Sequence, residues 1–343
     1  MKNELISVII PTYNAGKTIE RAINSVQNQA YENWEIVIID DGSNDDTKVK
    51  IEKFLKENRN IRYFYKKNEG VSKARNDGIR KSNGKYITFL DSDDIYCENY
   101  LSDFAKEVNE KAIITCNYNG NKKNPIRLPK DIDSFEKKDY YEFLDRENLL
   151  NSVWNKIYNK EVILENNIEF DQTIINGEDI LFNLEYIDKM EKFIYINNIN
   201  YKYIENNNSI THDLKNRDYF KQVKIVNRFI DIYIKNQFKY NKLLYKYIYT
   251  LRDAIDAKIE MKVKKKKTIE YINKCIEDQR MYNELKENQI SNKDLDTIIL
   301  KKLILRKNSR MIYTYIKNRN KLKGIKRKFG VKIDFGHESV EML

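Results

Sequence analysis

Short apolar segments alternate with amphipathic segments over the first hundred residues. The apolar segments have the length of buried strands, and the segments between them repeat apolar residues at the spacing of one helix face. Strands are predicted at residues 5–10, 34–39, 61–65 and 86–90, and helices at residues 18–29, 46–57 and 72–80. Strands that alternate with helices indicate a parallel sheet with helices on its faces. The pattern therefore predicts an α/β fold with a doubly wound, mostly parallel sheet.

Two further strands, at residues 112–116 and 193–196, and a helix at residues 180–190 are predicted later in the chain. After His212 the pattern changes to long windows with helical spacing, and turn residues nearly disappear. These windows are residues 219–234, 243–262, 269–287 and 295–315. The chain is therefore predicted to contain two domains: residues 1–212 with the sheet, and residues 213–343 as an α-helical domain.

The charge of the chain changes at the same place. Residues 1–212 contain 30 Lys and Arg against 36 Asp and Glu, whereas residues 213–343 contain 33 against 16. An acidic part followed by a basic part favours two units with separate functions over one nucleic-acid-binding surface, so we expect no nucleic acid partner. The basic part either docks at an anionic membrane surface or presents solvated helix faces. Homo-oligomerisation through its apolar stripes is equally open.

Composition excludes several classes of protein. Three cysteines are too few and too scattered for a disulfide framework, and two histidines disfavour a zinc enzyme built on histidine clusters. No run of about 18 apolar residues is present to span a bilayer. The N-terminus lacks the layout of a signal peptide. These features predict a cytoplasmic protein, and a peripheral position at the inner face of the membrane is left open.

Polar clusters follow each of the four strands predicted in the first hundred residues. They are Pro11-Thr12-Tyr13-Asn14, Asp40-Asp41-Gly42-Ser43, Asn68-Glu69-Gly70 and Asp91-Ser92-Asp93-Asp94. Ligands of open α/β sheets bind outside the carboxyl ends of the strands, where loops converge and helix N-termini point. Each cluster alone could be a turn, a helix cap or a solvated strand end. Because all four fall on one edge, they favour a site for a polar ligand.

Asp91 and Asp93 are separated by one residue, directly after an apolar strand. Alternate residues of an extended segment face the same side, so the two carboxylates can share one small region. A hard divalent cation, Mn²⁺ or Mg²⁺, would relieve their repulsion and neutralise the charge of a leaving diphosphate. Such strings are common in acidic loops, and only the position after the strand favours a metal site. His212 is either a third ligand or, as we prefer, a loop residue.

Arg75 and the pair Glu178-Asp179 each have two interpretations. Arg75 lies near the start of a predicted helix. It is either a solvated cation or a guanidinium held close to a nucleotide. Glu178 and Asp179 precede an apolar helical segment, and acidic residues at a helix N-terminus are stabilised by the dipole. The same dipole would keep Asp179 ionised near neutral pH, as a general base for an attacking hydroxyl requires.

Five motifs, in the correct order, resemble those of family 2 glycosyltransferases with the GT-A fold. They are Val8-Ile9-Ile10-Pro11-Thr12-Tyr13-Asn14, Ile38-Ile39-Asp40-Asp41-Gly42-Ser43, Asn68-Glu69-Gly70-Val71-Ser72 with Ala74-Arg75-Asn76, Asp91-Ser92-Asp93-Asp94, and Gly177-Glu178-Asp179. The likeness covers roughly the first 210 residues, and the helical remainder carries no recognised motif. It implies an inverting, metal-dependent enzyme that transfers a hexose or N-acetylhexosamine from a nucleotide-diphosphate sugar, with UDP as the expected nucleotide.

The resemblance also implies a role for each site residue. The expected nucleotide contacts are Pro11, Tyr13, Asp41, Asn68, Arg75 and Ser92. Asp93 is expected to be the principal metal ligand and Asp91 its companion. Asp179 would deprotonate the acceptor hydroxyl, with Glu178 beside it in the donor-sugar or acceptor pocket. Trp154 matches a family segment near the acceptor, although core packing explains a buried ring better.

The implied acceptor is a hydroxyl of a glycan, a lipid-linked precursor, a wall polymer or a protein. The segment Tyr203-Ile204-Glu205-Asn206 departs from the family, in which an Arg is frequent at this place. The alternative function is a catalytically inactive nucleotide-sugar-binding scaffold that acts through its helical domain. Retention of both Asp93 and Asp179 disfavours this alternative.

Overall fold

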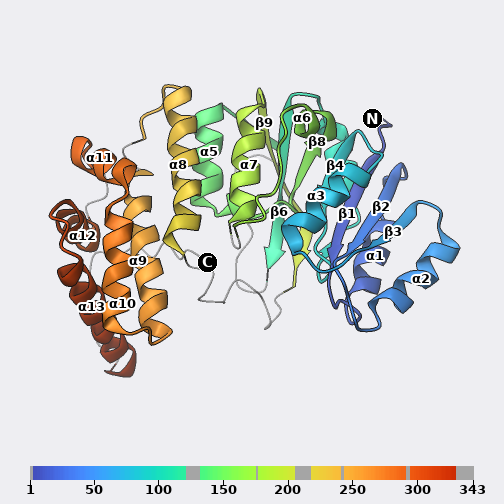
Figure 1. Cartoon of the computed structure of the whole chain (residues 1–343). Helices are drawn as coiled ribbons and strands as arrows, with labels where there is room; N and C mark the ends of the chain where they lie inside the picture. Colours follow the sequence, from blue (N-terminus) through green and yellow to red (C-terminus); the bar gives the residue numbers. More distant parts are fainter. Residues whose placement is uncertain are drawn as a thin grey trace. The chain divides into compact units, whose positions relative to one another are not determined.

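The computed structural model describes residues 3–120, 132–174, 177–204, 218–240, 243–290 and 294–329 (Figure 1). These residues divide into two compact units. The first lies within Met1–Thr173 and Gly177–Asn208, and the second lies within Ile174–Asn176 and Ser209–Leu343. The predicted boundary between residues 212 and 213 falls outside the described residues, so the division at that point and the separate functions stay predictions.

One nine-stranded sheet forms the centre of the described part of the first unit, in the order β3-β2-β1-β4-β8-β6-β9-β5, with β7 also paired to β9. The first four strands are β1 (Ile6–Thr12), β2 (Trp34–Asp40), β3 (Ile61–Tyr65) and β4 (Tyr86–Phe89). They pair in parallel, and Thr12 at the end of β1 lies opposite Asp40 at the end of β2. The carboxyl ends of these strands therefore lie on one edge of the sheet.

The remaining strands add antiparallel pairings. They are β5 (Ile95–Tyr96), β6 (Ala112–Gly120), β7 (Ile132–Phe135), β8 (Lys156–Asn159) and β9 (Lys192–Tyr203). Strand β8 runs antiparallel to β4 and β6, whereas β9 runs parallel to β6 and antiparallel to β5 and β7. The sequence pattern missed β5, β7 and β8 because each has only two to four residues and, unlike β4, is not part of a longer apolar run.

Helices pack on both faces of the sheet. They are α1 (Ile19–Gln27), α2 (Thr47–Glu57), α3 (Val71–Lys81), α4 (Tyr100–Glu107), α5 (Lys137–Arg146), α6 (Lys160–Glu165) and α7 (Glu178–Asp188). Val8 and Ile10 of β1 share a core cluster with Ile23 of α1. The intervening Ile9 faces α3, where a Cβ on Gly78 would lie 2.3 Å from the Ile9 side chain. Neighbouring residues of β1 thus pack against helices on opposite faces, which confirms the predicted α/β class.

The described part of the second unit is helical, as predicted. Its helices are α8 (Tyr219–Lys235), α9 (Tyr245–Glu260), α10 (Lys265–Ile276), α11 (Gln279–Glu287), α12 (Leu295–Leu305) and α13 (Ser309–Phe329). Two of the predicted windows each contain two helices, which corrects the sequence analysis. Residues 269–287 are divided where Asp278 caps α11 by accepting the N–H of Met281. Residues 295–315 are divided where Lys307 adopts a left-handed backbone with φ of 49°.

A buried ion pair joins the last two of these helices. Asp296 of α12 accepts hydrogen bonds from Arg319 and Tyr315 of α13. Both charges are almost completely withdrawn from solvent, so each depends on the other for compensation. None of the described helices combines the length and the apolar composition that crossing a bilayer requires.

Candidate active site

The first two polar clusters meet at the carboxyl ends of β1 and β2. The backbone N–H of Asp41 donates to the Thr12 carbonyl at 2.8 Å, which continues the parallel ladder beyond the strands. Asn14 adopts a left-handed backbone with φ of 49°, and its N–H donates to Ser43 Oγ at 2.8 Å. This turn leaves Tyr13 51% exposed, whereas Pro11 is buried inside β1. Tyr13 is therefore accessible to a ligand.

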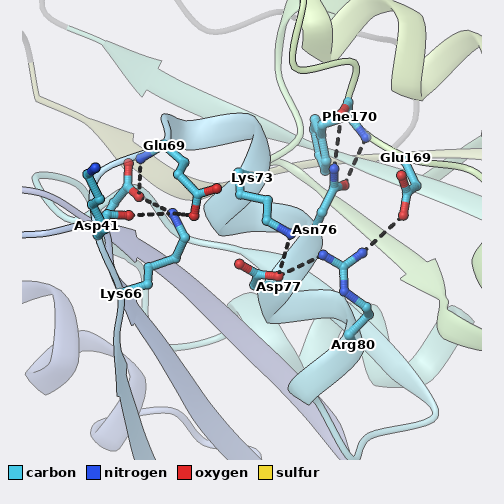
Figure 2. Close-up of polar contacts among 10 residues, drawn as sticks. Asp41, Lys66, Glu69, Lys73, Asn76, Asp77, Arg80, Glu169 and Phe170 are labelled. Carbon is cyan, nitrogen blue, oxygen red and sulfur yellow. Dashed lines mark hydrogen bonds and ion pairs between the residues drawn. The ribbon is translucent and has the colours of Figure 1, made fainter.

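The Asp41 carboxylate joins the second cluster to the third. Its oxygens accept the backbone N–H groups of Glu69 at 3.0 Å and Gly70 at 2.7 Å, and they form an ion pair with Lys66 (Figure 2). Backbone N–H groups and a nearby cation stabilise an ionised carboxylate. Asn68, the predicted nucleotide contact in this segment, is exposed. Asp41 is thus both a predicted nucleotide contact and the anchor of the 68–70 segment.

Arg75 of α3 connects the fourth cluster to Glu178 and Asp179. Its guanidinium lies 2.6 Å from the Asp179 carboxylate, 3.3 Å from that of Asp91 and 3.4 Å from that of Glu178. The guanidinium carbon also lies 5.3 Å from the centre of the Phe170 ring. Arg75 itself is buried. One guanidinium therefore holds together carboxylates from the turn after β4 and from the first turn of α7.

Phe170 is fixed beside Arg75 by a residue that the sequence analysis did not single out. The Asn76 amide donates to the Phe170 carbonyl at 3.0 Å and accepts its N–H at 2.9 Å (Figure 2). The Phe170 ring stacks on Phe182 of α7, with ring centres 4.0 Å apart. Asn76 directly follows Arg75 within the predicted motif, and this position was the only available signal of its role.

Asp179 lies in the first turn of α7, after Gly177, whose φ of 107° favours glycine. Burial raises the pKa of the Asp179 carboxyl to about 8, and Glu178 and Asp91 act in the same direction. Arg75 and Lys156 oppose this shift. The helix dipole, on which the prediction of an ionised Asp179 depends, favours ionisation, whereas burial, which the local sequence does not reveal, favours the protonated form. A carboxyl that titrates close to neutral pH is suited to accept and release a proton.

The fourth cluster is a turn between β4 and β5. Asp91, Ser92 and Asp93 are half-buried, and the Asp93 carbonyl accepts a hydrogen bond from Arg21. Asp94 instead points inward, where it accepts the Tyr201 hydroxyl at 2.6 Å and the Ile204 N–H at 2.7 Å. No role was predicted for Asp94. The structure shows that it attaches this turn to the end of β9.

Asp91 and Asp93 supply carboxylate oxygens, the donors that Mg²⁺ and Mn²⁺ prefer. Within the described ranges, no group of three or more His, Cys, Asp or Glu side chains has the arrangement of a metal site. A pair of carboxylates still fits a hard cation that takes its other ligands from substrate phosphates and water. His212, the predicted third ligand, lies outside the described residues.

Trp154 packs within an aromatic cluster. Its ring stacks on Tyr201 with centres 4.2 Å apart, and Tyr118 meets it edge-on at 4.9 Å. Only 9% of Trp154 is exposed. Core packing therefore accounts for this side chain, and contact with an acceptor stays a prediction.

Residues 7–166 match the family model described as glycosyl transferase family 2. This segment, just under half of the chain, is similar to glycosyl transferase family 2. The segment includes the turns that carry Asp41 and Asp93, together with Arg75 on α3. It ends before Glu178 and Asp179, which join the family 2 segment in space through Arg75.

Relatives named as glycosyltransferases share part of their length with the chain. "Uncharacterized glycosyltransferase YibD" of Escherichia coli (strain K12) is 32% identical over 219 residues, which are 60% of this chain and 63% of that protein. The "GalNAc(5)-diNAcBac-PP-undecaprenol beta-1,3-glucosyltransferase" of Campylobacter jejuni is 38% identical over 107 residues, which are 31% of this chain and 35% of that protein. The chain therefore spans less than two thirds of each of these curated relatives.

Among solved structures, the chain is similar to residues 1–349 of Staphylococcus aureus TarS in complex with UDP-GlcNAc. The TM-score is 0.70 at 19% sequence identity, over 93% of this chain and 92% of that one. This similarity confirms the predicted GT-A-type fold with a helical C-terminal region.

Proposed function

We propose that the chain is an inverting glycosyltransferase that moves a hexose or N-acetylhexosamine from a UDP-linked donor to an acceptor hydroxyl. The observation that carries this proposal is the buried contact of Arg75 with both Asp91 and Asp179. It places a candidate metal-binding carboxylate and a candidate base around one guanidinium. Direct displacement needs charge neutralisation on the leaving-group side and a base on the acceptor side, and these residues offer both.

The chemistry of the proposed reaction follows from these side chains. Asp179 takes the proton of the acceptor hydroxyl as its oxygen bonds to the anomeric carbon, and the bond from that carbon to the diphosphate oxygen breaks. A divalent cation held by Asp93 and Asp91 would neutralise the charge left on the diphosphate. Attack opposite the leaving group inverts the anomeric carbon without a covalent sugar intermediate. Glu178 lies beside Asp179 in the same helical turn, and we propose that it contacts the sugar or the acceptor.

The nucleotide is proposed to bind along the first three clusters and Ser92. Tyr13 is exposed for contact with the base or ribose above buried Pro11, and Asp41 and Asn68 lie on adjoining segments. The solved TarS structures in complex with UDP-GlcNAc and with UDP support a UDP-linked donor. The undecaprenol-linked substrate in the name of the Campylobacter jejuni relative supports a lipid-linked glycan as one acceptor class.

Nucleotide release from a panel of UDP-sugars, measured with Mn²⁺ and with lipid-linked and soluble glycan acceptors, tests this function. Asp179→Asn is expected to keep UDP affinity within about twofold and to lower transfer by about 10²- to 10⁴-fold, the usual contribution of a general base. Glu185→Gln, six residues later in α7, is the control and should retain transfer. Donor binding without turnover in the unaltered chain would support the inactive scaffold instead.

For the second unit we propose docking at an anionic membrane surface. Lys262 and residues 264–267 are all exposed lysines, and Met261 beside them is 43% exposed. Each cation near such a surface contributes about 1 kcal/mol. The full chain should sediment with phosphatidylserine vesicles at 0.1 M salt, and a variant with these five lysines changed to Gln should not. Equal sedimentation of both proteins would contradict the proposal, and concentration-dependent self-association without vesicles would favour an oligomer.

A further inference from the structure

Lys156, at the start of β8, is completely buried. Its ammonium donates to the Leu149 carbonyl at 2.6 Å, the Ser152 carbonyl at 2.7 Å and Asn155 Oδ1 at 2.9 Å. All three acceptors are uncharged oxygens, so no carboxylate among them offsets the cost of burying the cation. Burial lowers the pKa of Lys156 to about 7, and its three hydrogen bonds tie the side chain to the groups around it.

The acceptors of Lys156 lie on one short segment, residues 149–155, that folds around the ammonium. Its first part is a single 3₁₀ turn, Leu149–Asn151. Ser152 Oγ adds internal bonds, to the Leu149 carbonyl at 3.1 Å and to Asn155 Oδ1 at 3.0 Å. Removal of the ammonium would leave two buried carbonyls and one amide oxygen with fewer donors, and the segment would have to rearrange to satisfy them.

The same segment holds helix α7. Asn183 of α7 donates its amide to the Leu150 carbonyl at 2.8 Å and to the Ser152 carbonyl at 3.0 Å. Its Oδ1 accepts the Tyr158 hydroxyl of β8 at 2.7 Å. Asn183 is completely buried, and the Ser152 carbonyl receives Asn183 and Lys156 together. The position of α7 is therefore tied to the geometry that Lys156 imposes on residues 149–155.

Asn183 lies four residues after Asp179, so the two residues occupy the same face of α7 one turn apart. A helix held at Asn183 places the Asp179 carboxylate one turn earlier, where it meets Arg75. Lys156 also favours the ionised form of Asp179, in the same sense as Arg75 does. Asp179 is thus faced by Arg75 from α3, Asp91 from the turn after β4, Glu178 from α7, and Lys156 and Tyr158 from β8.

We propose that Lys156 is a positioning residue for Asp179. Its ammonium shapes residues 149–155, this segment clamps α7 through Asn183, and the clamp sets the place of the Asp179 carboxylate. The inference rests on the proposed function only in treating Asp179 as the base. Lys156 itself touches no reacting group.

The test compares Lys156→Met with Lys160→Met in the full chain. Lys160, four residues later, is a partly buried lysine that donates to the carbonyl of Ser82, the residue after α3, so it is a matched control for the loss of a lysine. The first readout is amide hydrogen exchange without donor. In Lys156→Met the amides of α7 should exchange about tenfold faster or more relative to those of α2, as expected when buried hydrogen bonds are lost. Lys160→Met should leave the relative exchange rate of the α7 amides unchanged.

The second readout is kinetic. Displacement of a base by about 1 Å costs about 10²-fold in rate, so Lys156→Met should lower kcat by that order while the donor KM stays within about twofold. Asn183→Ala, which removes the clamp and keeps Lys156, should produce the same split between kcat and KM and serves if Lys156→Met does not fold. Unchanged α7 exchange, or a rise in donor KM with kcat retained, would overturn the proposal. Absence of transfer by the unaltered chain would contradict the proposed function alone, because the exchange measurement needs no donor.

Discussion

The Arg75 guanidinium lies 2.6 Å from the Asp179 carboxylate, although the two residues are separated by more than one hundred positions in the chain. The same guanidinium reaches Asp91 and Glu178. Three carboxylates share one buried cation, so the cluster is negative when all three are ionised. Two of these carboxylates, Glu178 and Asp179, lie in the same helical turn. A site of this composition favours bound protons or cations, and its behaviour can be tested by removing either sign of charge.

Arg75→Met should lower the free energy of unfolding by about 3–5 kcal/mol at pH 8, because the substitution leaves buried carboxylates without their cation. Urea denaturation measures this loss. Arg80→Met is the control on the same helix, since Arg80 is 43% exposed and pairs with Asp77 and Glu169 at the surface. Its loss should stay below about 1 kcal/mol. Similar losses of unfolding free energy in both variants would show that the Arg75 contacts stabilise the fold no more than surface ion pairs do.

Asp179→Asn should raise stability at pH 8 and change it little below pH 4. The pKa of Asp179 is about 8 in the folded chain, above its ordinary value of 3.8. The folded state therefore retains a proton that the unfolded state has lost, and this favourable contribution, complete below pH 4, disappears as pH rises towards 8. The decline approaches about 1.4 kcal/mol for each pH unit, and the Asn variant lacks it. Parallel stability curves for the two proteins from pH 4 to 8 would contradict the shift.

The same pKa predicts the pH dependence of transfer. If Asp179 accepts the acceptor proton, kcat/KM for UDP release should rise with pH and level off above about pH 8, because only the ionised carboxylate is active. Steady-state rates between pH 5 and 9.5 at saturating Mn²⁺ provide the profile. If kcat/KM reached half of its maximum below pH 6, either the pKa of Asp179 would be close to its ordinary value or another group would limit the rate.

Local patterns were sufficient to predict the strand ends and the polar clusters, because apolar period and turn residues are properties of short segments. They could not predict the contact of Arg75 with Asp179, which depends on where α7 is placed. That placement is set by Asn183 and by residues 149–155, a segment without a regular period. For the same reason Asp94 was grouped with the ligand cluster, and only the position of Tyr201 shows that it faces the interior.

Removal of the metal tests the role of Asp93. Mn²⁺ together with UDP should raise the Tm of the unaltered chain, and EDTA should abolish the rise, because Asp93 and Asp91 would hold the cation and the cation would neutralise the diphosphate. Asp93→Asn should keep the Tm measured without ligands and lose most of the Mn²⁺-dependent rise. The control is Asp139→Asn, which changes an exposed acid on α5. An equal Mn²⁺ response in both variants would exclude Asp93 as the principal ligand.

Asp41→Asn should weaken binding of UDP by about tenfold or more. The carboxylate of Asp41 receives the N–H groups of Glu69 and Gly70 as well as Lys66, and an amide can accept fewer of these bonds and carries no charge (Figure 2). Loss of one charged hydrogen bond costs about 1.5–3 kcal/mol, and the 68–70 segment beside the proposed nucleotide pocket would shift. Asp77→Asn is a matched control, since Asp77 also pairs with two cations, Lys73 and Arg80, and both of these lie within α3. Isothermal titration with UDP and Mn²⁺ should show a lower UDP affinity for Asp41→Asn alone. Equal affinities in the two variants would contradict a place for Asp41 in the nucleotide pocket.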